Sequence, residues 1–299
     1  MYFIQPSSDS RPDFQDLLKN AKSLYWYNLA CFLLHLTSAV VLIALTGASD
    51  PWPVYATKRN ITWTPVNSSY SGQSCAKVKC KITVSDVVTG KVSLEWLVVA
   101  FHCCSVLAHL WNLTHQRTYY AWLTRKMNPG RWIEYFFSAS LMQVVIQILT
   151  GFTDAWNLAM AAVLIAVTQL FGHATEQFLY YSQNSIDPLE RWQFFWFGCL
   201  SFIVPWIAIL YTFAESAANS EPGPPAWVYG IIISLLVFFS SFAFVMIYYL
   251  RNWSDTFVSF KSERYYCGLS LVTKTILTWQ LYFGAFTRAQ NDVLAYKPK

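Results

Sequence analysis

The sequence predicts an all-α membrane protein: a seven-transmembrane-helix bundle with a small β-hairpin in its first extracellular loop. Of the 299 residues, 55% are hydrophobic and only 12% are charged, proportions that exclude an ordinary soluble domain. Apolar windows near the roughly 20 residues that a bilayer-spanning helix needs recur along the whole length. The chain is therefore expected to form a single membrane-embedded domain over residues 1–299.

Seven apolar windows qualify as spans, with a polar tail at each end. The first tail, residues 1–23, lacks the basic segment and cleavage site of a signal peptide, so the first helix is expected to act as an uncleaved signal-anchor. The second tail covers residues 287–299. In chain order the spans are expected at residues 24–46, 94–114, 132–150, 156–180, 193–214, 227–250 and 265–286.

The distribution of basic residues sets the expected orientation. Segments on the side of the amino terminus hold eleven Lys and Arg, against three in the short segments of the other side. The positive-inside rule therefore places the amino terminus in the cytoplasm and the carboxyl terminus outside. The outer loop 47–93 would narrow the contrast to eleven against nine, but long loops translocate with less regard for charge. Two glycosylation-type sequons in that loop, at Asn60 and Asn67, also favour an outside location.

The outer loop contains two β-prone runs. They cover residues 60–64 and 76–84, with Ser71-Gly72 between them, and predict a hairpin on the outer face. Cys75 and Cys80 could form a disulfide in that oxidising compartment, although two free thiols are an equal alternative. No group of cysteines has metal-ligand spacing, and no metal is expected. The net charge of +5 lies in loops and forms no basic, aromatic surface for nucleic acid.

Lys274 is the residue that points to a chemistry. It lies about ten residues from either end of its apolar stretch, too far to extend easily to the membrane surface. A lysine near a helix centre costs roughly 2.5–3.5 kcal/mol on insertion scales, so it needs a partner or a function. Burial in apolar surroundings favours the neutral, nucleophilic amine that forms a Schiff base with an aldehyde. The chain is therefore a candidate retinal protein.

A Schiff base that is protonated at rest needs a negative counterion. The spans contain few acids: Glu134 in the third, Glu176 near the cytoplasmic end of the fourth, Glu95 at the outer edge of the second and Glu215 at the outer margin of the fifth. Spans one, six and seven contain none. Glu134 is the best-placed counterion, because a lone intramembrane carboxylate is functional by default. The alternative is that Glu134 faces the cytoplasmic headgroups beside Arg131.

Hydroxyl and aromatic side chains are candidates for the surroundings of the Schiff base. Ser270 lies four residues before Lys274, on the same helix face, where it could hydrogen-bond the Schiff-base N–H. Trp279 and Trp206 could pack against a polyene. With 14 Trp in the chain, any one of them is more often bundle or interface packing.

Histidines offer a candidate polar cluster. His35 in the first span, with Ser105 and His109 at positions i and i+4 of the second, could converge and hold a proton. A lone buried histidine is more often a structural group, and His102 suggests nothing specific. Near the cytoplasmic surface, Glu176 could pair with the histidine three residues before it, but a solvated helix end is the favoured interpretation.

Several segments together resemble heliorhodopsins, over nearly the whole chain. They are Arg131-Trp-Ile-Glu134-Tyr, Leu269-Ser-Leu-Val-Thr-Lys274-Thr-Ile-Leu-Thr-Trp279, Phe195-Trp-Phe-Gly-Cys-Leu, Ile203-Val-Pro-Trp206, Tyr229-Gly-Ile-Ile-Ile-Ser-Leu and the long outer loop. The resemblance implies a rhodopsin-like fold with all-trans retinal on Lys274, Glu134 as counterion and a hydrated polar cluster from His35, Ser105 and His109. It also implies homodimers to which the outer loop contributes. The residues expected to contact the retinal are Lys274, Glu134, Ser270, Trp279, Trp206, Pro205, Phe239, Gly172 and Ser138.

Departures from ordinary microbial rhodopsins disfavour a standard proton pump. Such pumps usually carry Asp where this chain has Ser270, and a second acid where it has Val145. A pump needs a proton acceptor and usually a donor, and this bundle offers one clear carboxylate. Within the resemblance, Ala139 replaces a hydroxyl often found five residues past the counterion, which affects the hydrogen bonding expected there.

Two functions follow from these features. The leading hypothesis is a light sensor that signals to an unidentified partner through a slow conformational change. The alternative is a light-gated proton conductor, with Glu215 at the outer mouth and Glu134 and Glu176 toward the inside. A hydrolytic enzyme finds no support, because no nucleophile elbow or phosphate-cradling loop is present. The expected surroundings are membrane lipid and a second copy of the chain, not nucleic acid.

Overall fold

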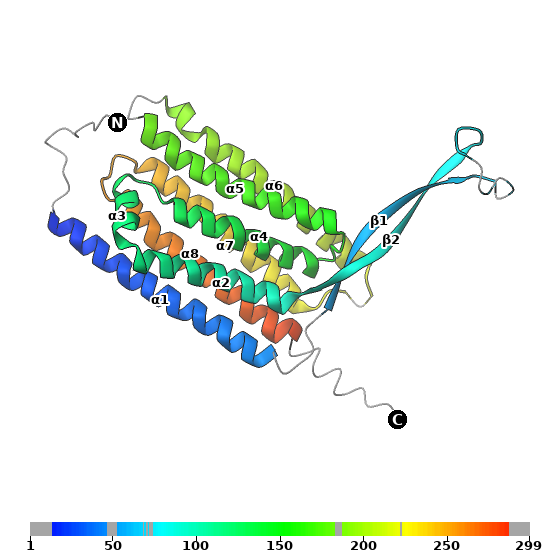
Figure 1. Cartoon of the computed structure of the whole chain (residues 1–299), viewed down its shortest axis with the longest axis horizontal. Coiled ribbons are helices and arrows are strands. Elements are labelled where there is room, and N and C mark those ends of the chain that lie inside the picture. The colour runs from blue at the N-terminus through cyan, green and yellow to red at the C-terminus, as the bar shows by residue number, and fades with distance from the viewer. Residues whose placement is uncertain are drawn as a thin grey trace.

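The computed structural model describes residues 14–46, 53–67, 69, 71, 74–182, 187–221 and 223–286. Eight α-helices, a two-stranded hairpin and a π-helical turn follow one another in this part of the chain (Figure 1). Their bounds are α1 (Phe14–Thr46), β1 (Pro53–Pro65), β2 (Cys80–Ser93), α2 (Leu94–Thr114), α3 (Gln116–Thr124), α4 (Pro129–Leu149), α5 (Ala155–Ser182), α6 (Pro188–Asn219), α7 (Ala226–Arg251), α8 (Val258–Leu281) and η2 (Tyr282–Phe286).

Seven long helices form one antiparallel bundle, as predicted. Six of the described helices, α1, α2, α4, α5, α6 and α7, are long and apolar enough to cross a membrane. The seventh, α8, has 24 residues, about 36 Å at 1.5 Å per residue, but its charged side chains lower its hydropathy. Figure 1 shows α1 beginning at the end of the bundle opposite the hairpin and α8 ending at the hairpin end. The predicted fold class is therefore confirmed.

The hairpin is longer than its sequence pattern indicates. Strands β1 and β2 pair antiparallel from Pro53 opposite Ser93 to Pro65 opposite Cys80, and they project well beyond the bundle (Figure 1). The base of the hairpin is joined to the turn between α4 and α5, where the Thr57 N–H donates to the Thr153 carbonyl at 2.9 Å. The predicted second run began at residue 76, but pairing begins only at Cys80. Gly72 of the predicted turn lies outside the described residues.

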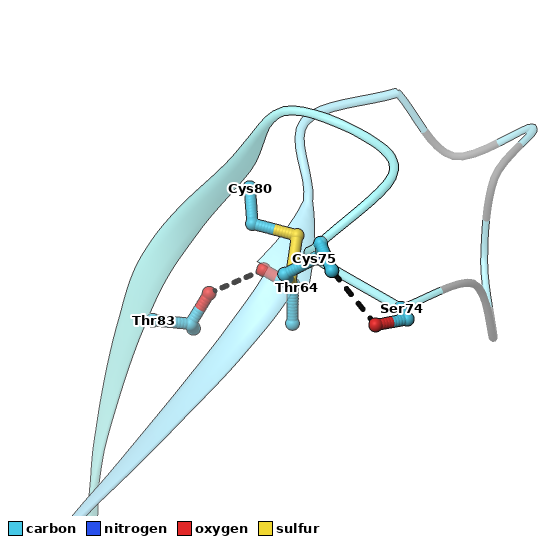
Figure 2. The surroundings of a disulfide bond; sticks show 6 residues. Thr64, Ser74, Cys75, Cys80 and Thr83 are labelled. Atoms are coloured by element: carbon cyan, nitrogen blue, oxygen red, sulfur yellow. Dashed lines mark hydrogen bonds between the residues drawn. A yellow bond between two sulfur atoms is a disulfide. The ribbon is translucent and has the colours of Figure 1, made fainter.

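A disulfide closes the loop at the tip of the hairpin. Cys75 and Cys80 are bonded, so the structure has the first of the two predicted alternatives (Figure 2). Beside it, the hydroxyls of Thr64 and Thr83 form a cross-strand hydrogen bond of 2.7 Å. The threonine pair links the two strands near the tip, and the disulfide fixes the loop to the start of β2.

Six of the seven spans begin earlier than predicted, with the largest differences in α1, α6 and α8, and one helix was not predicted. Residues 14–23, assigned to the cytoplasmic tail, form the first turns of α1, while residues 1–13 and 287–299 lie outside the described part of the chain. Helix α8 begins at Val258, not at residue 265, which brings Glu263 into a span predicted to contain no acid. Helix α3 is short and amphipathic, with Tyr119 and Leu123 buried. A hydropathy window misses these features because their polar residues lower the average. Most polar residues at the start of α1 and in α3 are exposed, whereas Glu263 at the start of α8 is buried.

Apolar side chains form two packed clusters, one toward each end of the bundle. At the hairpin end the core includes Leu42, Leu94, Ile148, Ile231 and Leu281. The core at the opposite end includes Trp132, Leu179, Tyr249, Trp253 and Val258. In a membrane such contacts act through close packing of the helices more than through exclusion of water.

Candidate functional site

Lys274 lies in the second half of α8 and is only 2% exposed. Its Nζ forms an ion pair with Oε1 of Glu134. It also donates to the Ser105 hydroxyl at 2.6 Å and to the Ser270 hydroxyl at 3.0 Å. An ammonium group buried in the bundle is strongly unfavourable alone, and these three partners on α2, α4 and α8 compensate its charge and fill its donor positions.

Glu134 reaches Lys274 from the second turn of α4. The start of that helix is fixed by Pro129 in its first turn and by the Asn128 side chain, which accepts from the Arg131 N–H at 3.3 Å. The Glu134 carboxylate accepts further hydrogen bonds from Ser105 at 2.7 Å and from Ser138 at 2.9 Å. Glu134 is therefore directed into the bundle, and the alternative in which it faces headgroups beside Arg131 is not what the structure shows.

A cavity opens beside Lys274 between α4, α5, α6, α7 and α8. About 120 Å³ of it is open to the centre of a water molecule, and its walls are almost entirely apolar and aromatic. Its few polar groups lie mainly near Lys274, on the α4 and α8 walls, with Thr168, Gln169 and Thr175 on α5. The aromatic residues that line it are Trp132, Tyr135, Phe194, Phe195, Phe202, Phe239, Phe242 and Tyr266.

Gly172 shapes one wall of this cavity. A Cβ atom at this position would lie 2.3 Å from the ring of Trp132, a distance that the packed bundle cannot accept. The glycine on α5 therefore allows the Trp132 ring of α4 to lie flat against the neighbouring helix. Gly172, Ser138 and Phe239, which were predicted to contact a ligand, all line the cavity.

Four predicted contact residues do not line the cavity: Glu134, which contacts Lys274 instead, Trp206, Pro205 and Trp279. Trp206 is buried behind it, with its ring 6.0 Å from that of Phe202 and 5.8 Å from that of Phe239. Pro205 precedes it inside α6. Trp279 packs against Tyr282 and Phe283 instead, because five residues of helix rotate it away from the Lys274 face.

The predicted histidine cluster is present in part and has a different membership. The rings of His35 and His109 stack at 5.8 Å, but Ser105 binds the Lys274–Glu134 pair instead. His102, from which nothing was expected, connects the cluster: its Nδ1 shares a hydrogen bond of 2.9 Å with His35 Nδ1. Its Nε2 shares one of 2.8 Å with Thr278, one turn beyond Lys274. The seven-residue spacing between His102 and His109 on one helix face could have indicated this.

A second group of charges lies at the end of the bundle opposite the hairpin. Arg131 forms ion pairs with Glu176 of α5 and Glu263 of α8, and all three are buried. Glu176 also accepts from the Asn128 N–H at 2.8 Å and from Trp132 Nε1 at 2.9 Å. The interpretation of Glu176 as a solvated helix end is therefore wrong. Glu263 was missed because the seventh span was predicted to begin after it.

Glu215 lies apart from these groups. It is exposed in the last turns of α6, at the hairpin end, and it does not line the cavity beside Lys274. The other predicted members of a proton route, Glu134 and Glu176, lie in ion pairs with Lys274 and Arg131.

Comparison with known proteins agrees with this fold and site. A crystal structure described as a light-driven proton pump, LR (Mac), from Leptosphaeria maculans superposes with a TM-score of 0.59 and 14% identity, over 94% of this chain and 98% of that one. The fold is therefore that of a microbial rhodopsin. Residues 24–286 match the family described as Heliorhodopsin, and the chain belongs to it. No curated protein matches the chain.

Family, fold and cavity together define a retinal-binding rhodopsin that is an integral membrane protein. The residues present fit the chromophore, since an elongated apolar molecule with one aldehyde requires an aromatic cavity with an amine in its wall. Lys274 is the only lysine among the residues that line the cavity.

Proposed function

We propose that this heliorhodopsin is a photoreceptor in which Lys274 holds all-trans retinal and Glu134 is the counterion. The bound chromophore supplies a protonated Schiff base and a double bond that isomerises in light. The observation that carries the proposal is the buried Lys274–Glu134 ion pair at the wall of an aromatic cavity. It supports these roles because the carboxylate lies where a positive charge on the lysine nitrogen needs neutralising.

The side chains around the pair have defined roles in this proposal. Ser105 and Ser270 orient the Lys274 nitrogen, and Ser138 orients the carboxylate of Glu134. The aromatic walls exclude water and restrict the shapes that the ligand can adopt. A change of charge or shape at Lys274 is thus transmitted to α2, α4 and α8 through direct contacts, which supports a sensory role.

The proposed orientation places the amino terminus in the cytoplasm. The connections at the end of the bundle opposite the hairpin carry most of the basic residues of the short segments, which supports this assignment. Glu134 and the Arg131 cluster then lie on the cytoplasmic side. We also propose a homodimer to which the hairpin contributes, because several of its apolar side chains are exposed; they include Ile61, Trp63, Ile82 and Val84.

Reconstitution with retinal tests the attachment site. Lys274→Ala should abolish the visible absorption band that wild-type protein acquires with all-trans retinal. Because Lys274→Ala alone leaves Glu134 buried and unpaired, the matched variant Lys274→Ala/Glu134→Gln keeps the site uncharged and separates loss of attachment from misfolding. A retained visible band in either variant would refute Lys274 as the attachment residue.

Light-gated proton conduction is the second candidate, favoured by two buried amides on α4. The side-chain nitrogen and oxygen of Gln143 and Oε1 of Gln147 have no hydrogen-bond partner among the described residues. Such groups require water, so they support a hydrated route between Lys274 and the hairpin end. Voltage clamp under light, with different proton gradients, distinguishes proton conduction from sensing. A current that reverses with the proton gradient would favour conduction, and coloured protein without current would favour sensing.

A further inference from the structure

The buried cluster of Arg131, Glu176 and Glu263 contains more acid than base. The guanidinium of Arg131 pairs with both carboxylates, and none of the three residues is more than 8% exposed. Fully ionised, the cluster would hold one negative charge in excess inside the protein. Burying an uncompensated charge is strongly unfavourable, and a protein relieves it by binding a proton or a second cation.

The groups packed against the cluster do not supply that second cation. Asn128 donates to Glu263 at 2.7 Å, Tyr119 donates to Glu263 at 3.3 Å, and Trp132 donates to Glu176; all three donors are neutral. The other titratable groups facing it are Tyr135 of α4, His173 of α5, Tyr249 of α7, and Tyr266 and Cys267 of α8. His173 alone among these can become cationic, but among the described residues it forms no ion pair with Glu176 or Glu263, whose only ion-pair partner is Arg131.

A small cavity lies between this cluster and the counterion. Its walls include Arg131 and Glu263 on one side and Glu134 on the other, with His109, Asn112 and Ser270 between them. About 20 Å³ is open to the centre of a water molecule, more than the roughly 10–15 Å³ that one water needs. Arg131, which lines this cavity, has a buried Nε without a hydrogen-bond partner among the described residues, and a group of this kind requires a water.

We propose that Glu176 and Glu263 share one bound proton, and that a water in the small cavity connects this second protonation site to Glu134. Release of the proton breaks one carboxyl O–H bond and transfers the proton to that water. The site therefore lies between the counterion and the bundle end opposite the hairpin, where it can respond to a change of charge at Glu134. The bound proton is independent of the proposed photoreceptor function, whereas the connection to Glu134 rests on it.

Infrared spectroscopy of retinal-reconstituted protein, kept in the dark at neutral pH, tests the bound proton. Wild type should show a C=O band of a protonated carboxylic acid that shifts in D₂O. Glu263→Gln and Glu176→Gln should each lose the band, because the remaining carboxylate is then neutralised by Arg131. The control Glu190→Gln, which removes an exposed carboxylate at the start of α6, should keep it. A band that persists in both cluster variants would overturn the proposal.

A second measurement on unmutated protein covers the case in which the variants do not fold. With glutamate labelled by ¹³C at the carboxyl carbon, the band must shift; a wild-type spectrum without a protonated glutamate would overturn the proposal. Light-minus-dark spectra then test the connection, since illumination should perturb this band. A coloured protein whose band is insensitive to light would refute the connection. A colourless protein would count against the photoreceptor function. The dark spectrum would still show whether Glu176 and Glu263 hold a proton.

Discussion

The Lys274–Glu134 pair is tolerated in the bundle because three partners surround Nζ of Lys274 and two hydroxyls donate to Oε1 of Glu134. Ser105 bridges the two, since its oxygen accepts from Lys274 and its hydrogen is donated to Glu134. Replacing either charged residue alone would leave an unpaired ion among buried side chains, which costs roughly 3–5 kcal/mol for a buried pair. The pairing therefore makes the two residues dependent on each other, as attachment site and counterion should be.

Individual residues could be predicted where a sequence distance fixes a geometry. Ser270 lies one helical turn from Lys274, and the structure places its hydroxyl 3.0 Å from Nζ. Contacts between distant helices could not be predicted in this way. His102 contacts Thr278 across 176 positions, and Arg131 contacts Glu263 across 132, so only the packed bundle reveals them.

Gly172→Ala tests the close approach of α4 and α5. The added methyl group would collide with the Trp132 ring, so we expect a loss of about 1–3 kcal/mol in stability and a shift of the visible band. Thermal unfolding and absorption of the retinal-bound protein measure both effects. Gly230→Ala on α7 is the matched control, because a Cβ there meets nothing within 4 Å. Equal unfolding temperatures for the two variants would contradict this packing.

At the scale of elements, side-chain interactions that hydropathy does not detect stabilise the helix ends on the side of the bundle opposite the hairpin. The connection between α7 and α8 is an example. Lys261 of α8 donates to Asp255 at 2.6 Å, and Lys126 of the α3–α4 connection donates to the Trp253 carbonyl. Helix α8 begins beside this connection, seven residues before its predicted start, in a segment whose charged residues a hydropathy window excludes.

Asp255→Asn tests the contribution of this connection as a function of pH. Partial burial tends to raise the pKa of Asp255, but hydrogen bonds from Lys261 and the Phe257 N–H outweigh it and hold the pKa below its usual value. The stabilisation is therefore present above the unfolded-state pKa and is lost as the pH falls through the lowered folded-state pKa. Because the pair is partly exposed, we expect an effect below about 1 kcal/mol.

Thermal unfolding of wild type and Asp255→Asn at a series of pH values measures this difference. The variant should be slightly less stable at neutral pH, and the two proteins should converge in acid. A difference that grows toward acid pH would show that the ion pair is not its source.

At the scale of the whole molecule, the number and order of the spans followed from the sequence because each apolar window is long and separated by polar segments. The exception is α8, whose charged residues lower its hydropathy below that of the other spans. The aromatic cavity did not follow from the sequence. It is lined by residues of five helices, and a chain with 14 Trp, 18 Tyr and 22 Phe does not reveal which of them converge.

The visible absorption of Glu134→Gln over a range of pH tests the central claim most directly, with Glu190→Gln as a control for loss of a carboxylate elsewhere. If Glu134 neutralises the charge on the Lys274 nitrogen, its removal destabilises the protonated chromophore. As the pH is raised, the Schiff base loses its proton and the visible band is replaced by a band at shorter wavelength. In Glu134→Gln this change should occur at a markedly lower pH than in wild type or in the control. A Glu134→Gln protein that keeps its visible band to the same pH as wild type would contradict the assignment of Glu134 as counterion.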